Sequence, residues 1–214
     1  MSARADATTL TVRAGATGHT RKRRATARSA SDEGAAGASV GPAAAPLEGL
    51  APVISSATRL IVLGSFPGVA SLRAQQYYGH PRNHFWPILF AIFEARSPGG
   101  SEVSCLSSYQ VRSDWLLARG VGLWDVYAAC ERDGSLDSQI RHPVVNDFSV
   151  LQRRCPQLQA IAHNGGESFK HARHTAALGL PVHKLPSTSP ANASWRFERK
   201  LAAWREIFQQ HGLV

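Results

Sequence analysis

The chain has 214 residues, with 24 Lys and Arg against 15 Asp and Glu, and therefore a formal net charge of +9. No apolar run reaches about 18 residues, which argues against a transmembrane helix. Its three cysteines, at positions 105, 130 and 155, are too few and too far apart for a disulfide framework, a zinc ribbon or an iron–sulfur cluster. These features indicate a reduced, cytoplasmic protein whose charge suits an anionic partner.

Residues 1–57 contain no aromatic side chain and are rich in Ala, Gly, Ser, Thr and Arg. Such a segment buries too little apolar surface to offset chain entropy, so we expect it to be disordered. Its basic run at 21–24 (RKRR) has three interpretations: a loose nucleic-acid contact, an organelle-targeting signal, or a solvated tail. Residues 58–214 hold all the aromatic residues and are the expected folded domain.

The first half of that domain alternates strand and helix patterns. Residues 59–64 form an apolar run that ends in glycine, which predicts a buried parallel strand. Residues 82–94 predict a helix with Pro87 near its first turn. Residues 108–119 predict a second helix, and residues 121–126 (VGLWDV) a second strand.

The alternation continues to the end of the chain. A helix is expected at 146–155, a strand at 158–162, a helix from Gly166 to about Leu178, and a strand at 180–185. Residues 193–211 predict an amphipathic helix. This order indicates a parallel sheet covered on both faces, with ligands beyond the carboxyl ends of the strands. Four loops meet there: 64–84, the stretch after Trp124, 163–166 and 186–192.

Several common site patterns do not match. The loop 64–68 (GSFPG) is not a nucleophile elbow, a phosphate-binding loop or a dinucleotide fingerprint. His171 and His174 lie three residues apart on a predicted helix, but no acidic or cysteine ligand accompanies them. We therefore expect a solvated helix face there, and no metal.

The loop 64–86 combines glycine and proline with paired tyrosines, an amide and basic groups, which suits a planar heterocycle. This loop resembles the uracil-DNA glycosylase superfamily, and specifically its hypoxanthine-DNA (deoxyinosine) glycosylase branch. The matching segments are 64–68 (GSFPG), 77–86 (YYGHPRNHFW), 122–126 (GLWDV), 164–165 (NG) and 185–190 (LPSTSP). The resemblance covers roughly residues 58–210.

The resemblance implies an α/β fold, a three-layer α/β/α sandwich with a short four-stranded parallel sheet. It also implies a monofunctional glycosylase that flips a deaminated base out of DNA and hydrolyses its N-glycosidic bond, without cofactor, as a monomer. Phe66 occupies the position at which the mismatch-specific uracil branch has its catalytic Asn, and the resemblance assigns catalysis to Asn83 instead. The expected substrate-binding residues are Ser65, Phe66, Tyr78, His80 and Asn164, and the expected DNA-binding residues are Arg82, Ser187, Thr188, Ser189 and Pro190.

Simpler interpretations stay open for these residues. Tyr77 and Tyr78 suit half-buried aromatics with satisfied hydroxyls, and Asn83 suits a helix N-terminal cap. His80 suits a brace for its own loop, and Asp125 an acceptor for loop amides rather than a group that acts on substrate. The basic balance also suits ordinary surface charge.

Two other functions compete with the glycosylase: a non-catalytic nucleic-acid-binding protein on the same fold, and a nucleotide-binding module that uses Gly64 to Gly68. Within the glycosylase hypothesis, hypoxanthine is the expected base, with uracil second.

Overall fold

The computed structural model describes residues 46–93 and 108–214. Its centre is a parallel four-stranded sheet in the order β3-β2-β6-β7. The strands are β2 (Leu60–Gly64), β3 (Val121–Asp125), β6 (Ala160–Asn164) and β7 (Val182–Leu185). Every residue of β2 and β3 is buried, as expected of parallel strands that read as continuous apolar runs.

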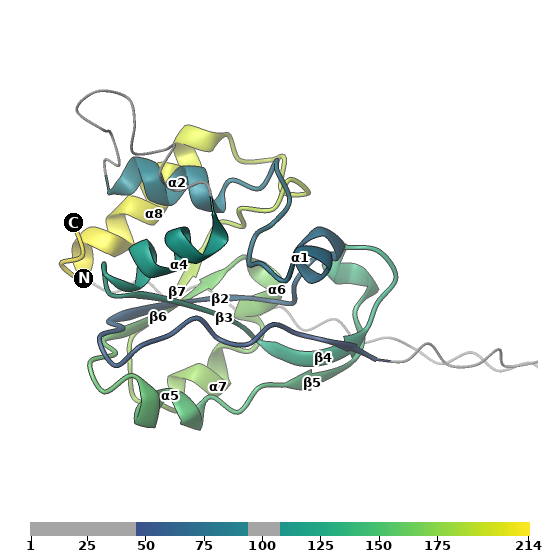
Figure 1. The fold of residues 1–214 in the computed structure, drawn as a ribbon, viewed down its shortest axis with the longest axis horizontal. Helices are drawn as coiled ribbons and strands as arrows, with labels where there is room; N and C mark the ends of the chain where they lie inside the picture. Colours follow the sequence, from purple (N-terminus) through teal and green to yellow (C-terminus); the bar gives the residue numbers. More distant parts are fainter. Residues whose placement is uncertain (1–45, 94–107) are drawn as a thin grey trace, which may run out of the picture. The chain divides into compact units, whose positions relative to one another are not determined.

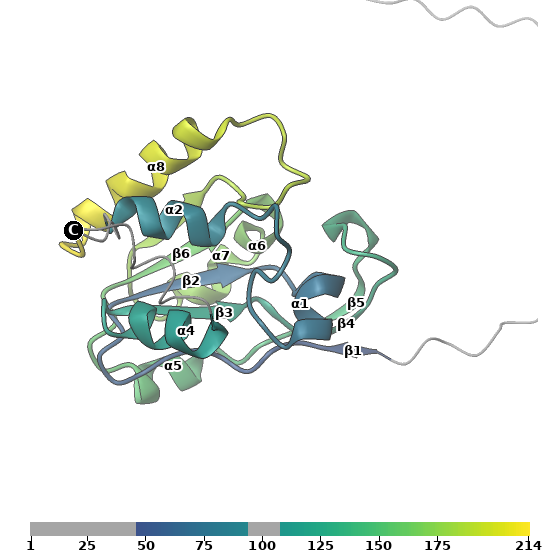
Figure 2. The same cartoon turned by 45° about the horizontal axis from the view of Figure 1, so that its top comes forward.

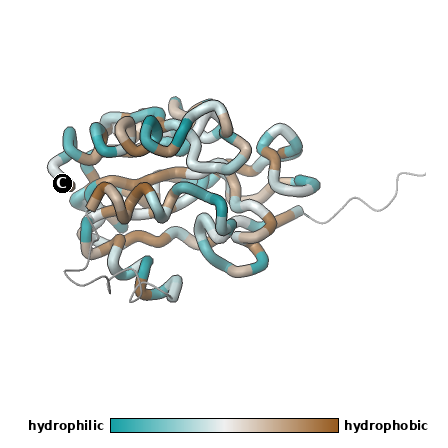
Figure 3. The backbone as a smooth tube through the Cα atoms, turned by 90° about the horizontal axis from the view of Figure 1, so that it is seen from above, coloured by the Kyte–Doolittle hydropathy of each residue, from teal (hydrophilic) through white to brown (hydrophobic). Residues whose placement is uncertain are grey.

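Helices cover both faces of this sheet. On one face lie α2 (Phe85–Ile92), α4 (Tyr109–Leu117) and α8 (Phe197–Gln210), and on the other α5 (Ser149–Arg154) and α7 (Ala172–Ala176) (Figure 1, Figure 2). Alternate residues of β2 serve the two cores: Leu60 and Val62 pack in the first, Ile61 and Leu63 in the second. The apolar segments accordingly run through the middle of the domain (Figure 3). The predicted three-layer α/β/α sandwich is confirmed.

The helix boundaries follow local chemistry. Pro87 is the third residue of α2, within the first turn, where its missing N–H costs no helical hydrogen bond. Ser108 caps α4 by accepting a hydrogen bond from the Val111 N–H. The helix expected from Gly166 to Leu178 is instead two short helices, α6 (Gly166–Phe169) and α7, separated at Lys170 and His171.

A second, antiparallel sheet was not expected. It has the order β1-β4-β5, from β1 (Leu47–Glu48), β4 (Tyr127–Glu131) and β5 (Arg141–Val145), with a 3₁₀ helix at Asp137–Gln139 between the last two. The first four residues of β5 are exposed and its pairing with β4 is irregular, so no apolar pattern marks it in the sequence. A further short helix, α1 (Val69–Ala74), lies within the stretch expected to be loop.

The folded region also begins earlier than predicted. Leu47 and Glu48 pair with β4, and Val53 exchanges two backbone hydrogen bonds with Leu123, of 2.9 and 2.8 Å. Leu50 packs against the first core. The prediction of disorder is therefore wrong for residues 46–57, whose few apolar side chains pack against the two cores. Residues 1–45 lie outside the described part of the chain, as do Cys105 and the last residue of the helix predicted at 82–94.

Across residues 46–93 and 108–214, no helix has the length and apolar character needed to span a membrane.

Candidate active site

A cavity of about 460 Å³ lies at the carboxyl ends of the parallel strands. All four predicted loops line it, and its volume is typical of ligand sites. Every predicted site residue except Arg82 contributes to the lining. The cavity also receives residues 135–138, from the unexpected segment between β4 and β5.

The loop after β2 forms the floor. Gly64 has no space for a side chain, because a Cβ there would lie 2.3 Å from Asp125 Oδ1. Phe66 is buried, and the Arg132 guanidinium lies 5.1 Å from its ring centre while donating to the Pro67 carbonyl. Ser65 Oγ donates a 2.7 Å hydrogen bond to Asp137 Oδ1. The position of Phe66 therefore presents an aromatic ring, without any amide, to the cavity.

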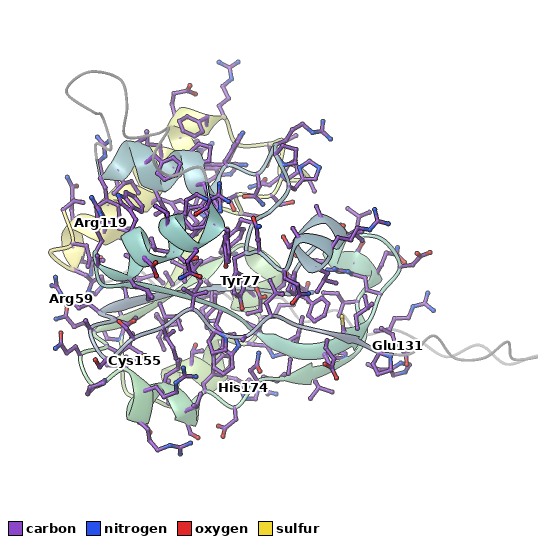
Figure 4. All side chains as sticks on the ribbon, viewed as in Figure 1. Arg59, Tyr77, Arg119, Glu131, Cys155 and His174 are labelled. Atoms are coloured by element: carbon purple, nitrogen blue, oxygen red, sulfur yellow. The ribbon has the colours of Figure 1, made fainter. Side chains whose placement is uncertain are left out.

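The paired tyrosines behave differently from each other. Tyr77, labelled in Figure 4, is buried, and its hydroxyl donates to the Leu50 carbonyl at 3.1 Å, as the structural interpretation requires. Tyr78 has a positive φ of 55° and stacks on Phe85 with ring centres 3.8 Å apart. Its hydroxyl is buried without a well-formed hydrogen bond among the described residues, and burial raises its pKa far above the usual value, against a smaller opposing effect of the Asn164 side chain. The positive φ and the hydroxyl without a well-formed hydrogen bond distinguish Tyr78 from Tyr77.

Asn83 lies one residue before His84, the N-cap of α2, and lines the cavity. Its Oδ1 accepts a 2.9 Å hydrogen bond from the Phe85 N–H at the start of α2. Only an oxygen accepts from that N–H, so the orientation of the amide is fixed. Its Nδ2 forms no hydrogen bond within the described ranges, and the residue lines the cavity. The hydrogen bond from Phe85 thus holds the Asn83 amide in place at the cavity.

Asn164, at the end of β6, is tied to the opposite loop. Its Oδ1 accepts from the Thr188 N–H and its Nδ2 donates to Thr188 Oγ1, both at 2.9 Å. Thr188 is fully buried, so its side chain holds Asn164 and is not placed for the direct DNA contact expected of it. Gly165 follows with a φ of +105°, and a Cβ there would lie 2.9 Å from the Ser187 Cβ.

Helix α8 holds both ends of the loop 186–192. Trp204 Nε1 donates to the Pro186 carbonyl at 3.0 Å, and Lys200 Nζ donates to the Asn192 carbonyl at 2.9 Å. Lys200 is almost completely buried, and desolvation lowers its pKa. Within the loop, Ser187 Oγ accepts from the Ser189 N–H, whereas Pro190 is exposed.

The remaining predicted contacts lie at the rim. His80 Nδ1 accepts a 3.1 Å hydrogen bond from the Arg82 N–H, so His80 braces its own loop while also lining the cavity. The Arg82 side chain is exposed and outside the lining.

The surroundings of Asp125 differ from those expected from the sequence. Its carboxyl accepts no hydrogen bond from a loop amide, and Oδ2 is buried without a partner among the described residues. Burial, with the neighbouring charge of Asp137, raises the pKa of Asp125 to about 8, although the Arg132 guanidinium partly opposes this rise. Its place at a strand end was the only signal in the sequence.

The histidines do not form a metal site in the described ranges, where no group of three or more metal-binding side chains occurs. His163 is fully buried between Ser168 Oγ at 2.8 Å and Thr175 Oγ1 at 2.9 Å, and burial lowers its pKa to about 4. His171 lies 2.9 Å from the Tyr127 hydroxyl, which donates to Glu167. His174, labelled in Figure 4, stacks on His171.

Comparisons with known proteins identify the family of the chain. Residues 51–208 match the family model of the uracil DNA glycosylase superfamily. The chain is 36% identical over 163 residues to a hypoxanthine DNA glycosylase of Methanosarcina barkeri, covering 76% of this chain and 98% of that protein. A hypoxanthine DNA glycosylase of Methanosarcina acetivorans is 34% identical over 162 residues, covering 75% of this chain and 97% of that protein.

A solved structure is also similar. It is the solution NMR structure of a presumed uracil DNA glycosylase from Methanosarcina acetivorans, with a TM-score of 0.67 and 31% identity, covering 78% of this chain and 99% of that one. The family match spans most of the described domain, and the strand-end cavity is lined by every residue that the resemblance assigned to the site except Arg82. The chain belongs to the uracil DNA glycosylase superfamily.

Proposed function

We propose that this DNA glycosylase excises hypoxanthine from DNA by hydrolysis of its N-glycosidic bond, with uracil as a second substrate. The observation that carries the proposal is the convergence of Tyr78, Asn83 and Asn164 on one strand-end cavity. The names of the two Methanosarcina relatives support the choice of hypoxanthine. A base inside a duplex is out of reach, so the substrate nucleotide must first be flipped out, at a cost of a few kcal/mol.

Tyr78 and Asn164 are suited to hold the flipped base. The Tyr78 ring is backed by Phe85, and stacking of a base on an aromatic ring contributes about 1–3 kcal/mol. Asn164 Nδ2 carries two hydrogens, of which Thr188 takes one. The second interacts weakly with the Tyr78 hydroxyl and is suited to donate instead to the lactam carbonyl that hypoxanthine and uracil share. Adenine and cytosine carry a donor at that position, so the fixed amide disfavours these two bases.

Asn83 is suited to position the attacking water. Its Oδ1 keeps one lone pair beyond the bond to Phe85, and its Nδ2 is unengaged by the described residues. An amide is a poor general base, so the bond to the base breaks ahead of the attack, and Asn83 orients water toward the cationic sugar. The positive charge of the chain attracts the phosphates of DNA. Arg82 and Pro190 are exposed at the rim of the cavity and are suited to contact the DNA backbone. In this proposal the protein acts as a monomer.

The test is excision from oligonucleotides that contain inosine, uracil, xanthine or a normal base, single- and double-stranded, followed by alkaline cleavage of the abasic product. We expect scission at inosine, and weaker scission at uracil. DNA binding without scission at any base would instead support the non-catalytic interpretation.

Two variants separate the hydrogen bond that Asn83 accepts from Phe85 from the proposed role of Asn83 in positioning water. Asn83→Ala should reduce excision by about 100-fold, as a misplaced reactant does, with little change in DNA affinity. Asn83→Asp keeps the acceptor for the Phe85 N–H and serves as the stability control. If Asn83→Ala excises hypoxanthine at the wild-type rate, Asn83 does not position the water.

A further inference from the structure

Asp125 contributes a carboxyl group to the cavity, whereas the asparagines of the lining contribute only amides. It is the last residue of β3, only 4% exposed, and it lines the cavity. Its Oδ2 has no hydrogen-bond partner within the described ranges. A buried polar atom without a partner is rare in native proteins and calls for an explanation.

The packing around Gly64 fixes this carboxyl at the floor of the cavity. A Cβ on Gly64 would lie 2.3 Å from Asp125 Oδ1 and 3.5 Å from the Tyr78 hydroxyl. The carboxyl and the phenol therefore approach the same backbone position, from β3 and from the loop 64–84. Tyr78 is the aromatic residue suited to stack on the flipped base, so Asp125 lies beside the position of that base.

The charges around Asp125 favour its neutral form. The titratable and charged groups that face it are Tyr77, Tyr78, Asp137 and Arg132. Neither of the two ion pairs in the described part of the chain includes Asp125. Burial and the charge of Asp137 raise its pKa to about 8 against the opposing effect of Arg132. Burial and the charge of Asp137 thus favour the protonated carboxyl, which is the form able to donate a proton.

Resting on the proposed function, we propose that Asp125 is the general acid that protonates the departing purine. As the bond between C1′ and N9 breaks, its electron pair goes to the base, and a ring nitrogen such as N7 takes the proton from the carboxyl. Hypoxanthine then leaves as a neutral molecule. Water adds its oxygen to C1′, and the proton that it releases restores the acid, so that one water is consumed for each base released.

The proposal separates purine from pyrimidine chemistry. Asn83 and Asn164 are amides and have no proton to transfer at neutral pH. Uracil has no counterpart of N7 and leaves as an anion that hydrogen bonds stabilise. Protonation by Asp125 thus matters for hypoxanthine and much less for uracil.

The experiment compares single-turnover excision of hypoxanthine and uracil by the wild-type protein and by Asp125→Asn between pH 5.5 and 9.5, at saturating enzyme. The wild-type rate on hypoxanthine should fall as the pH rises through about 8. Asp125→Asn should lose about 100-fold or more on hypoxanthine and that pH dependence with it, while its rate on uracil stays within about threefold of wild type. Melting temperature and DNA affinity establish that the variant is folded.

Asp137→Asn is the matched variant, because it removes the other carboxyl of the cavity. Without the Asp137 charge the pKa of Asp125 is lower, so the decline on hypoxanthine should move to lower pH with Asp125 still active.

Three results would overturn the role of Asp125: an equal loss on both bases, no loss on hypoxanthine, or an unchanged decline near pH 8 in Asp125→Asn. If Asp125→Asn does not fold, or if uracil is not cleaved, the test is the pH dependence of the wild-type rate on hypoxanthine. A wild-type rate that does not fall as the pH rises refutes the proposal. Absence of hypoxanthine excision by the wild-type protein is a different result, which refutes the proposed function itself.

Discussion

Two walls of the same cavity are built in different ways. The clamped wall, residues 186–192, is held by side chains from β6 and α8, and Thr188 at its centre is fully buried. The other wall, residues 132–140, is called the exposed wall because its residues 133–139 are exposed to solvent. Its hydrogen bonds to the loop after β2 lie mostly at the surface. Segments with few buried contacts open at low cost in free energy. The clamped wall thus fixes the Asn164 amide, for which we propose a base-reading role, whereas the exposed wall is the less restrained side of the cavity.

The largest expected effect comes from the contact between Asn164 and Thr188. Asn164→Ala removes both hydrogen bonds and leaves the buried Thr188 N–H without a partner. Because each unsatisfied buried group costs about 1–3 kcal/mol, we expect the free energy of unfolding to fall by roughly 2–5 kcal/mol, measured by urea denaturation.

The matched change on the exposed wall is Ser65→Ala, which removes the surface hydrogen bond to Asp137. It should cost about 0.5–1 kcal/mol. An equal loss in the two variants would remove the distinction between the walls.

Two glycines give the next comparison. Gly165 has a φ of +105°, and a Cβ there would lie 2.9 Å from the Ser187 Cβ. Backbone strain costs about 1–3 kcal/mol and the close approach adds to it, so Gly165→Ala should lower the free energy of unfolding by roughly 2–4 kcal/mol.

Gly134, in the exposed wall, has a φ of +70°, and a Cβ there would meet no atom of the described residues within 4 Å. Gly134→Ala therefore carries backbone strain alone, about 1–2 kcal/mol. Calorimetry gives the loss of unfolding free energy in each variant, and the larger loss in Gly165→Ala measures the close packing against Ser187. Equal losses in the two variants would contradict this close packing.

Lys200 gives the clamped wall a pH signature. Its folded-state pKa is lowered by burial, so between that value and its ordinary 10.5 the unfolded chain binds a proton that the folded chain does not. Wild-type stability relative to Lys200→Met should therefore rise with pH toward 10.5, by at most about 1.4 kcal/mol per pH unit. Tyrosines also titrate at alkaline pH, but their contribution is the same in the wild type and in Lys200→Met and cancels in the difference between the two stabilities.

Lys170 is the opposite case and serves as the control. Its partner Glu167 raises its pKa, so the stability it contributes is lost as the pH rises through the raised value. Stability relative to Lys170→Met should therefore fall with pH. Differences of the same sign in the two variants would contradict the assignment for Lys200.

The sequence predicted the clamped wall better than the exposed one. Strands β2, β3, β6 and β7 are apolar runs because they are buried in the sheet, and the loops at their ends follow from the parallel order. The hairpin that carries the exposed wall has no comparable pattern, since most of β5 faces solvent. The lack of a partner for Asp125 Oδ2 and the burial of Lys200 depend on packing between segments far apart in the sequence, which no local pattern encodes.

The smallest expected effect on stability, and the sharpest test of the exposed wall, is at Leu136. Its side chain is 54% exposed and lines the cavity. Leu136→Ala should change the free energy of unfolding by less than about 0.5 kcal/mol, as exposed substitutions do. If this wall closes on the duplex, binding buries the remaining half of the side chain, worth about 1 kcal/mol.

We therefore expect Leu136→Ala to weaken binding to an inosine-containing duplex by about fivefold, measured by fluorescence anisotropy at fixed salt. Val144→Ala, which truncates an equally exposed side chain on β5 outside the cavity lining, is the control and should bind as the wild type does. Equal affinities for all three proteins would place the exposed wall away from the DNA. Its role would then be limited to holding Asp137 beside Asp125, and the adjustment to the duplex would have to come from the rim around Arg82 and Pro190.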